Sequence, residues 1–142
     1  MPSGRGGCCI SDIDHARVLL GMAYDDLKAL QHMRDPDAFA EGIFGFRAQQ
    51  AIEKSFKAWI AAVGSKYPLI HDIEELISVL RTLGHGDKNL DVYVDYNPFA
   101  VQFRYAEFDY AEEPLDREHA IVKIQVLYDR VKGVMEEIEG QG

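Results

Sequence analysis

Apolar side chains recur at every third or fourth position in the stretch from residue 44 to residue 63. The apolar positions are Phe44, Ala48, Ile52, Phe56, Trp59 and Val63. This spacing places them on one stripe of an α-helix, so we predict a long helix over about residues 38–63 with this stripe buried. The opposite side of the helix is polar, and its residues are Gln50, Glu53, Lys54 and Lys57. Glu53 and Lys57 are four residues apart, which suits a surface ion pair.

Three other stretches have the same spacing and predict helices over about residues 11–33, 71–84 and 114–138. The first and last of these helices each carry an unbroken apolar stripe, as expected for helices that face a common core. Asp25 and Asp26 lie beside the stripe of the first helix, and we interpret them as solvated side chains.

Residues 90–110 allow two local structures. Val92, Val94 and Tyr96 alternate with polar neighbours, and Asn97-Pro98 is a turn signal, which is typical of a β-hairpin. The same residues also fit helical spacing, and an isolated hairpin would need the other helices to cover it. We therefore favour a helix that is kinked or interrupted at Pro98.

The predicted fold class is all-α, an up-and-down bundle of about five helices. No linker divides the chain, so residues 11–139 are expected to form a single domain. Residues 1–10 are expected to be a disordered leader. Cys8 and Cys9 in this leader are adjacent, and they cannot form an ordinary disulfide with each other.

Two glycines lie within the second predicted helix, and a third follows it. Gly42 and Gly45 each cost roughly 1 kcal/mol relative to alanine inside a helix, so they indicate a kink or the close approach of another helix or a ligand. Gly64 follows the last apolar position of the helix and is predicted to cap its C-terminus.

The composition is that of an ordinary soluble globular domain of 142 residues. Lysine and arginine total 15 against 24 aspartate and glutamate residues, which gives a formal net charge of -9. An acidic chain argues against broad capture of DNA or other nucleic acid, which needs clustered cations. The sequence contains no stretch typical of a membrane span or a signal peptide, so we expect a cytoplasmic protein.

Several kinds of catalytic chemistry lack their sequence signals. The five histidines are scattered, and there is neither a Glu-x-x-His pair nor a cluster of cysteine and histidine, so no metal site is predicted. The glycine-rich phosphate loops of nucleotide-binding folds are also missing. We therefore predict no bound metal and no cofactor.

Three features of the chain match the central motif of one family: the run FRAQQAIEKSFKA at residues 46–58, Gly64 with Pro68, and the pair His71-Asp72. Phe103-Arg104-Tyr105 matches a second element of the same family, which precedes the last helix. Together they resemble the HEPN domain family over about residues 13–138. The resemblance implies a helical bundle that is often dimeric and often encoded beside a minimal nucleotidyltransferase. From it we expect a homodimer that binds a nucleotide, a minimal nucleotidyltransferase, or both.

The resemblance also makes ribonuclease activity a function to consider. Some members of the family carry an arginine followed four to six residues later by a histidine. Such a pair suits RNA cleavage, since arginine stabilises negative charge and histidine moves protons near neutral pH. This chain departs from that pattern. No histidine follows Arg104 at the required distance, and Arg81 with His85 is only a near match interrupted by Gly84.

We therefore predict a HEPN-type domain without catalysis of its own. The candidate ligand-binding residues are Gln50, Glu53, Lys54, Lys57, His71, Asp72 and Arg104. Among them the cations suit phosphate, and Gln50 and Glu53 suit sugar or base hydroxyls. Each residue also has a structural interpretation, such as a surface pair for Glu53 or a helix cap for Asp72. The alternatives are a ribonuclease that pairs Arg81 with His85 or Arg104 with His119, and an acidic dimeric scaffold.

Overall fold

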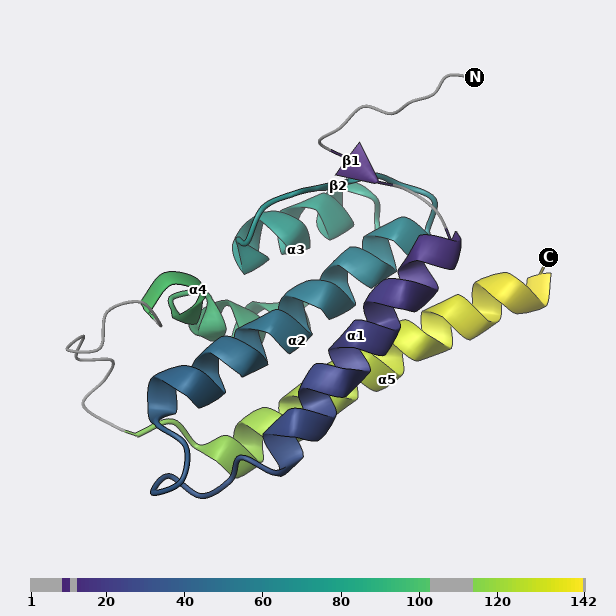
Figure 1. The fold of residues 1–142 in the computed structure, drawn as a ribbon. Coiled ribbons are helices and arrows are strands. Elements are labelled where there is room, and N and C mark those ends of the chain that lie inside the picture. Colours follow the sequence, from purple (N-terminus) through teal and green to yellow (C-terminus); the bar gives the residue numbers. More distant parts are fainter. Residues whose placement is uncertain (1–8, 11–12, 103–113, 142) are drawn as a thin grey trace.

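The computed structural model describes residues 9–10, 13–102 and 114–141, and it confirms an all-α bundle (Figure 1). Its elements are α1 (Ile13–Gln31), α2 (Glu41–Ala62), α3 (Ile73–Thr82), the 3-10 helix η1 (Lys88–Tyr96), α4 (Phe99–Gln102) and α5 (Arg117–Gln141). Two short strands, β1 (Cys9–Ile10) and β2 (Tyr67–Pro68), pair antiparallel with Cys9 opposite Pro68. Helical periodicity does not predict this strand pair.

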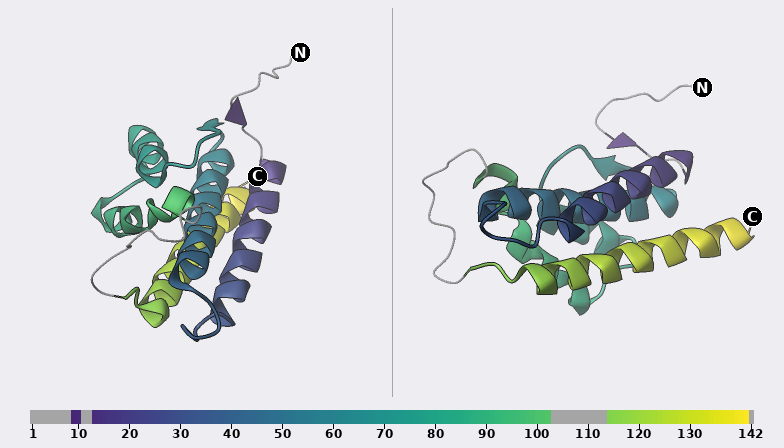
Figure 2. Two further views of the ribbon diagram at one scale, coloured as in Figure 1. Left: turned by 60° about the vertical axis from the view of Figure 1, so that its left-hand side comes forward. Right: turned by 60° about the horizontal axis from the view of Figure 1, so that its bottom comes forward.

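Helix α2 lies at the centre of the bundle. It contacts α1 and α5 on one side and α3, η1 and α4 on the other, as the left view in Figure 2 shows. Helix α1 runs opposite to α2 and α5, which share a direction because the α3 to α4 segment returns the chain (Figure 1). None of the described helices is long and apolar enough to cross a membrane.

The predicted apolar stripe of α2 is buried, as expected. Phe44, Ile52, Phe56 and Trp59 are at most 2% exposed, and only Val63 at the end of the stripe is half-buried. The prediction of a solvated polar face was wrong for two of its members. Glu53 is 3% and Lys57 is 7% exposed, because α2 is covered by neighbours on nearly every side.

Gly45 and Gly64 have the roles that the sequence predicted. A Cβ added to Gly45 would lie 2.2 Å from the ring of Phe99, so this glycine permits the close approach of α4. Gly64 has a φ of +84°, the left-handed conformation that ends a helix and favours glycine.

The structure confirms the helical interpretation of the ambiguous segment as far as residue 102. Helix η1 ends at Tyr96, and α4 begins at Phe99, so Asn97 and Pro98 mark the predicted interruption. Residues 103–110 lie outside the described part of the chain. Helix α5 begins three residues after Pro114, where the carboxylate of Asp116 accepts a hydrogen bond from the backbone N–H of His119.

Candidate functional site

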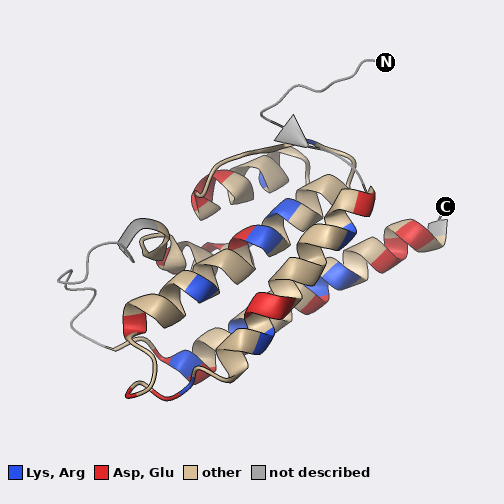
Figure 3. Cartoon of the chain, viewed as in Figure 1, with Lys and Arg blue, Asp and Glu red and all other residues tan. Residues whose placement is uncertain are grey.

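Five polar side chains lie along one side of α2, two of them buried and three at least partly exposed. We call Arg47, Gln50, Glu53, Lys54 and Lys57 the α2 polar stripe. Steps of three and four residues place them along one side of the helix. Figure 3 shows the basic segments of this stripe along α2, between α1 and α3.

Glu53 is the centre of one hydrogen-bond network, on the α3 side of the stripe. Its carboxylate accepts from Gln49 Nε2 at 2.9 Å, from Lys57 Nζ at 2.7 Å and from His71 Nδ1 at 3.0 Å. Gln50 Nε2 extends the network by donating to Gln49 Oε1 at 2.8 Å. The buried carboxylate therefore has a full set of donors, which a buried charge needs if it is not to destabilise the fold.

His71 connects this buried network to solvent. Its side chain is 71% exposed, although Nδ1 lies against Glu53. A carboxylate only accepts hydrogen bonds, so Nδ1 carries the proton. The second ring nitrogen of His71 therefore remains available at the surface.

The network continues beyond Lys57 to α1. The Lys57 ammonium lies 5.6 Å from the ring centre of Tyr67, and the Tyr67 hydroxyl lies 2.6 Å from Nε2 of His15. Burial raises the pKa of Tyr67. These contacts join α1, β2 and α2 through polar groups, so Lys57 is held on two sides.

Asp26 of α1 is the centre of a second network, on the other side of the stripe. Its carboxylate accepts from Arg47 Nη1 at 2.9 Å and from Lys54 Nζ at 3.0 Å. Asp26 is 4% exposed, so the prediction of a solvated side chain was wrong. Its two cations reach solvent, since the side chain of Arg47 is 47% exposed and that of Lys54 is 19% exposed.

The structure brings some of the candidate ligand-binding residues together and separates others. Gln50, Glu53, Lys57 and His71 meet in the Glu53 network, whereas Lys54 lies on the α1 side.

Asp72, another candidate, caps α3 by accepting from the backbone N–H of Glu74 and Glu75, and it also accepts from Asn97 Nδ2 at 2.9 Å. Arg104, the remaining candidate, lies outside the described residues.

Sequence reasoning missed Arg47, Gln49 and Asp26 as members of these networks. A signal for Arg47 was present, because Arg47 and Lys54 are seven residues apart and therefore lie two turns apart on one face. Nothing comparable marks Asp26, since its environment depends on how α1 packs against α2.

The arginine and histidine pairs of the ribonuclease alternative do not form a visible site in the described part of the chain. Arg81 Nη2 donates to the backbone oxygen of Asp87 at 2.9 Å and to Asp91 Oδ1 at 2.8 Å. His119 lies in the first turn of α5, and its proposed partner Arg104 is not among the described residues. Nor do the described residues include a cluster of three side chains able to hold a metal ion.

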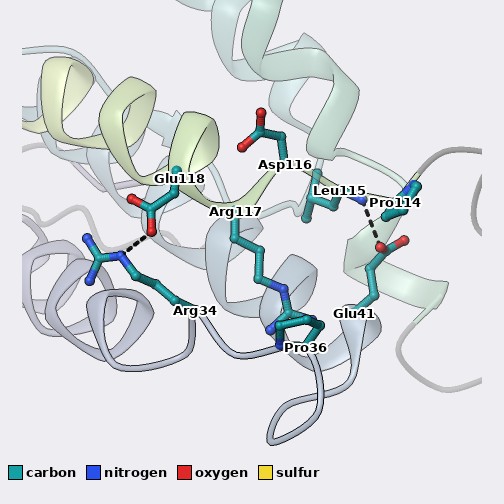
Figure 4. Close-up of a pocket in the computed structure, with 8 residues that line it drawn as sticks. All are labelled: Arg34, Pro36, Glu41, Pro114, Leu115, Asp116, Arg117 and Glu118. Carbon is teal, nitrogen blue, oxygen red and sulfur yellow. Dashed lines mark hydrogen bonds and ion pairs between the residues drawn. The ribbon is translucent and has the colours of Figure 1, made fainter.

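A cavity of about 320 Å³ lies where the α1–α2 loop meets the start of α5 (Figure 4). Its charged groups are already paired. Arg34 lies 2.6 Å from Glu118, and Glu41 Oε1 accepts from the backbone N–H of Leu115 at 2.8 Å. Buried Arg117 donates to backbone oxygens, including that of Phe39 at 2.6 Å. These contacts attach the loop to α5. The charged groups of this cavity therefore have a structural role, and no ligand is needed to explain them.

Two tyrosines of η1 are buried against the bundle. Burial raises the pKa of Tyr93 to about 12 and that of Tyr96 to about 12. The Tyr93 hydroxyl donates to the backbone oxygen of Lys123 at 2.7 Å, and its ring packs edge-on against Phe56. Both tyrosines therefore serve packing between η1, α2 and α5.

Fold and site together define a small helical bundle with two polar networks on its central helix. A family model of the HEPN domain matches residues 16–134 of the 142-residue chain, and the chain belongs to this family. No curated protein and no solved structure matched the chain in the corresponding comparisons.

Proposed function

We propose that the protein binds the phosphate groups of a nucleotide on the α2 polar stripe. The observation that carries this proposal is the arrangement of Arg47 and Lys54. Both side chains lie on one face of α2, both are held by the buried carboxylate of Asp26, and both are partly exposed, Arg47 to 47% and Lys54 to 19%. A guanidinium has five N–H donors and an ammonium three, so one contact with Asp26 leaves donors for an oxyanion.

The local charge supports the same proposal. Three cations, Arg47, Lys54 and Lys57, face two carboxylates, Asp26 and Glu53, so the group has an excess of one positive charge. The chain as a whole has a formal net charge of -9, so this excess is a local exception. An anion is attracted to such a surface, and buried carboxylates hold the cations in place before it arrives.

Different members of the stripe take different roles in this proposal. Arg47 and Lys54 bind phosphate oxygens. Gln50, which lies between them on the helix, offers its amide oxygen to a ribose or base hydroxyl, because its nitrogen already donates to Gln49. His71 borders the other side of the stripe with its free ring nitrogen. Lys57 supports Glu53 from within the protein and is assigned no ligand contact.

Calorimetric titration of ATP and GTP tests the proposal. The double variant Arg47→Gln and Lys54→Gln should bind roughly ten- to a hundredfold more weakly than the wild type, since it loses two charged hydrogen-bonding groups. The matched control is Lys88→Gln with Lys132→Gln, which changes the net charge equally at exposed positions away from the stripe. Equal weakening by both double variants, or no binding by the wild type at millimolar nucleotide, would refute the proposal.

A further variant separates binding from folding. Adding Asp26→Asn to the Arg47→Gln and Lys54→Gln change removes the carboxylate that would otherwise be left buried without a partner. This triple variant should fold and still fail to bind nucleotide. Tight binding by the folded triple variant would exclude Arg47 and Lys54 as the phosphate ligands.

A further inference from the structure

A second cavity, of about 500 Å³, lies between the C-terminal end of α2, the loop after α3 and the C-terminal half of α5. It is lined by Ala62, Val63, Gly64, His85, Val134, Glu137 and Ile138. None of these residues belongs to the α2 polar stripe. The cavity has the size of a site for a small organic molecule.

The lining is apolar apart from two ionisable side chains. Val134 and Ile138 are four residues apart and form one wall from α5, and Ala62 and Val63 form the wall from α2. His85 and Glu137 are exposed at the rim of the cavity, and within the described part of the chain their side chains form no hydrogen bond or ion pair, unlike the charged groups of the first cavity. Mostly apolar walls with a few unpaired polar groups are typical of ligand sites.

The loop that carries His85 is held firmly by two arginines. Arg81 donates to the backbone oxygen of Asp87, and Arg130 Nη2 lies 3.0 Å from Asp87 Oδ2 while its guanidinium stacks 4.8 Å from the ring centre of Trp59. The backbone N–H of His85 also donates to the oxygen of Leu80 at 2.9 Å. These contacts hold the backbone of His85 in place before any ligand binds, while its side chain is exposed.

The electrostatics of the cavity favour a cation. Glu137 supplies a carboxylate, and the C-terminal end of α2 supplies the negative end of a helix dipole. No basic residue lies in the last turn of α2 to neutralise that end. The imidazole of His85 can accept a hydrogen bond from an ammonium group.

We propose that this cavity binds a small apolar molecule that carries one protonated amine. The apolar body lies against Val63, Val134 and Ile138. The ammonium group pairs with Glu137 and donates to His85 at the end of α2.

NMR titration with 2-phenylethylamine tests the charge requirement, with neutral 2-phenylethanol as the isosteric comparison. The amide signal of Gly64 reports on the cavity wall, and the indole N–H of Trp59, the single tryptophan of the chain, reports on the turn of α2 before it. The amine should bind at least about tenfold more tightly than the alcohol, the difference expected for one charge-assisted contact. Equal binding of the two molecules, or no shift at millimolar amine, would overturn the proposal.

Two variants locate the site. Glu137→Gln should remove the preference for the amine, whereas Glu136→Gln makes the same charge change on the neighbouring residue, which is equally exposed but does not line the cavity, and should leave it intact. Val134→Phe should fill the cavity and abolish binding of both molecules, with folding checked by circular dichroism. An equal effect of Glu136→Gln and Glu137→Gln, or undiminished binding by folded Val134→Phe, would show that the amine binds elsewhere.

Discussion

Charge is handled in contrasting ways at the α2 polar stripe and in the cavity beside Glu137. At the stripe, the buried carboxylates of Glu53 and of Asp26 from the neighbouring α1 each accept from at least two side chains. In the cavity, Glu137 and His85 lie beside apolar walls without a partner among the described residues. Buried charges must be paired to keep the fold, whereas an exposed charge such as that of Glu137 is hydrated and stays available for a ligand.

The two networks of the stripe also differ from each other. Lys57 is 7% exposed and cannot reach water easily if Glu53 is lost. Arg47 and Lys54 are more exposed and can be hydrated if Asp26 is lost. The Glu53 network should therefore contribute more to stability, and the Asp26 network should be better suited to exchange its contacts for those of a ligand.

The largest expected effect is that of Glu53→Gln, which leaves the ammonium of Lys57 buried without a counter-charge. We expect a loss of about 3–5 kcal/mol in the free energy of unfolding by urea. Replacing Glu53 and Lys57 together by methionine should recover most of this loss, because no unpaired charge then remains. The control Glu74→Gln, on the exposed face of α3, should change stability little; a Glu53→Gln loss below about 1 kcal/mol would contradict the account.

The next largest effect is a loss of stability at alkaline pH. It arises from two buried tyrosines that belong neither to the α2 polar stripe nor to the cavity beside Glu137. Below pH 10, Tyr93 and Tyr96 are protonated in both the folded and the unfolded chain. Because the pKa of each is about 12 in the folded protein, the unfolded chain releases these protons first as pH rises from 10 to 12. Stability should fall over this window by roughly 2–3 kcal/mol per tyrosine.

Urea unfolding at pH 9 and pH 11, with tyrosinate absorbance as the second readout, measures this loss. Tyr96→Phe should reduce the loss of stability with rising pH by about half, because Tyr93 remains. Tyr24→Phe, at a partly exposed position, is the matched control. Unchanged stability between the two pH values would show that the tyrosines are not buried as described.

A smaller effect is expected for Asp26→Asn. The substitution removes the shared acceptor of Arg47 and Lys54, but both cations remain accessible to water. We expect a loss of about 1–2 kcal/mol, closer to that of hydrogen bonds than to that of a buried ion pair. The free energy of unfolding by urea is measured for this variant and for the control Asp25→Asn, which changes the exposed neighbouring residue. The difference between the two gives the contribution of the Asp26 contacts. A loss as large as that of Glu53→Gln would remove the distinction between the two networks.

The smallest effect is that of Glu137→Gln on the free protein. Glu137 has no partner to lose, and it lies near the negative end of α2, so stability should stay within about 0.5 kcal/mol of the wild type. Thermal unfolding measures the change. A marked destabilisation would mean that Glu137 has a structural role instead of a role in ligand binding.

The helices could be predicted from the sequence because apolar periodicity reports which side of each helix is covered. The roles of Gly45 and Gly64 could also be predicted, because glycine within a helix or directly after it has only a few structural explanations. The β1–β2 pair was not predictable, because two residues carry no periodic signal. Nor was the interruption at Pro98 separable from a hairpin by local pattern alone.

The site was harder to predict than the fold. Local spacing identifies Glu53 and Lys57 as a pair, but their burial follows from α2 being covered on several sides. The pairing of Asp26 with Arg47 joins residues 21 positions apart, so it depends on tertiary packing. The cavity beside Glu137 combines three distant segments, and no local pattern marks such a site.

The central claim is that the stripe binds an anion and the cavity binds a cation, independently of each other. Mapping of backbone amide shifts in one NMR sample, with ATP added first and 2-phenylethylamine second, tests it most directly. We predict that ATP shifts the amides around Arg47, Lys54 and His71, and that the amine shifts those around Gly64, His85 and Glu137. Shifts by both ligands at the same amides, or at neither group, would contradict the account.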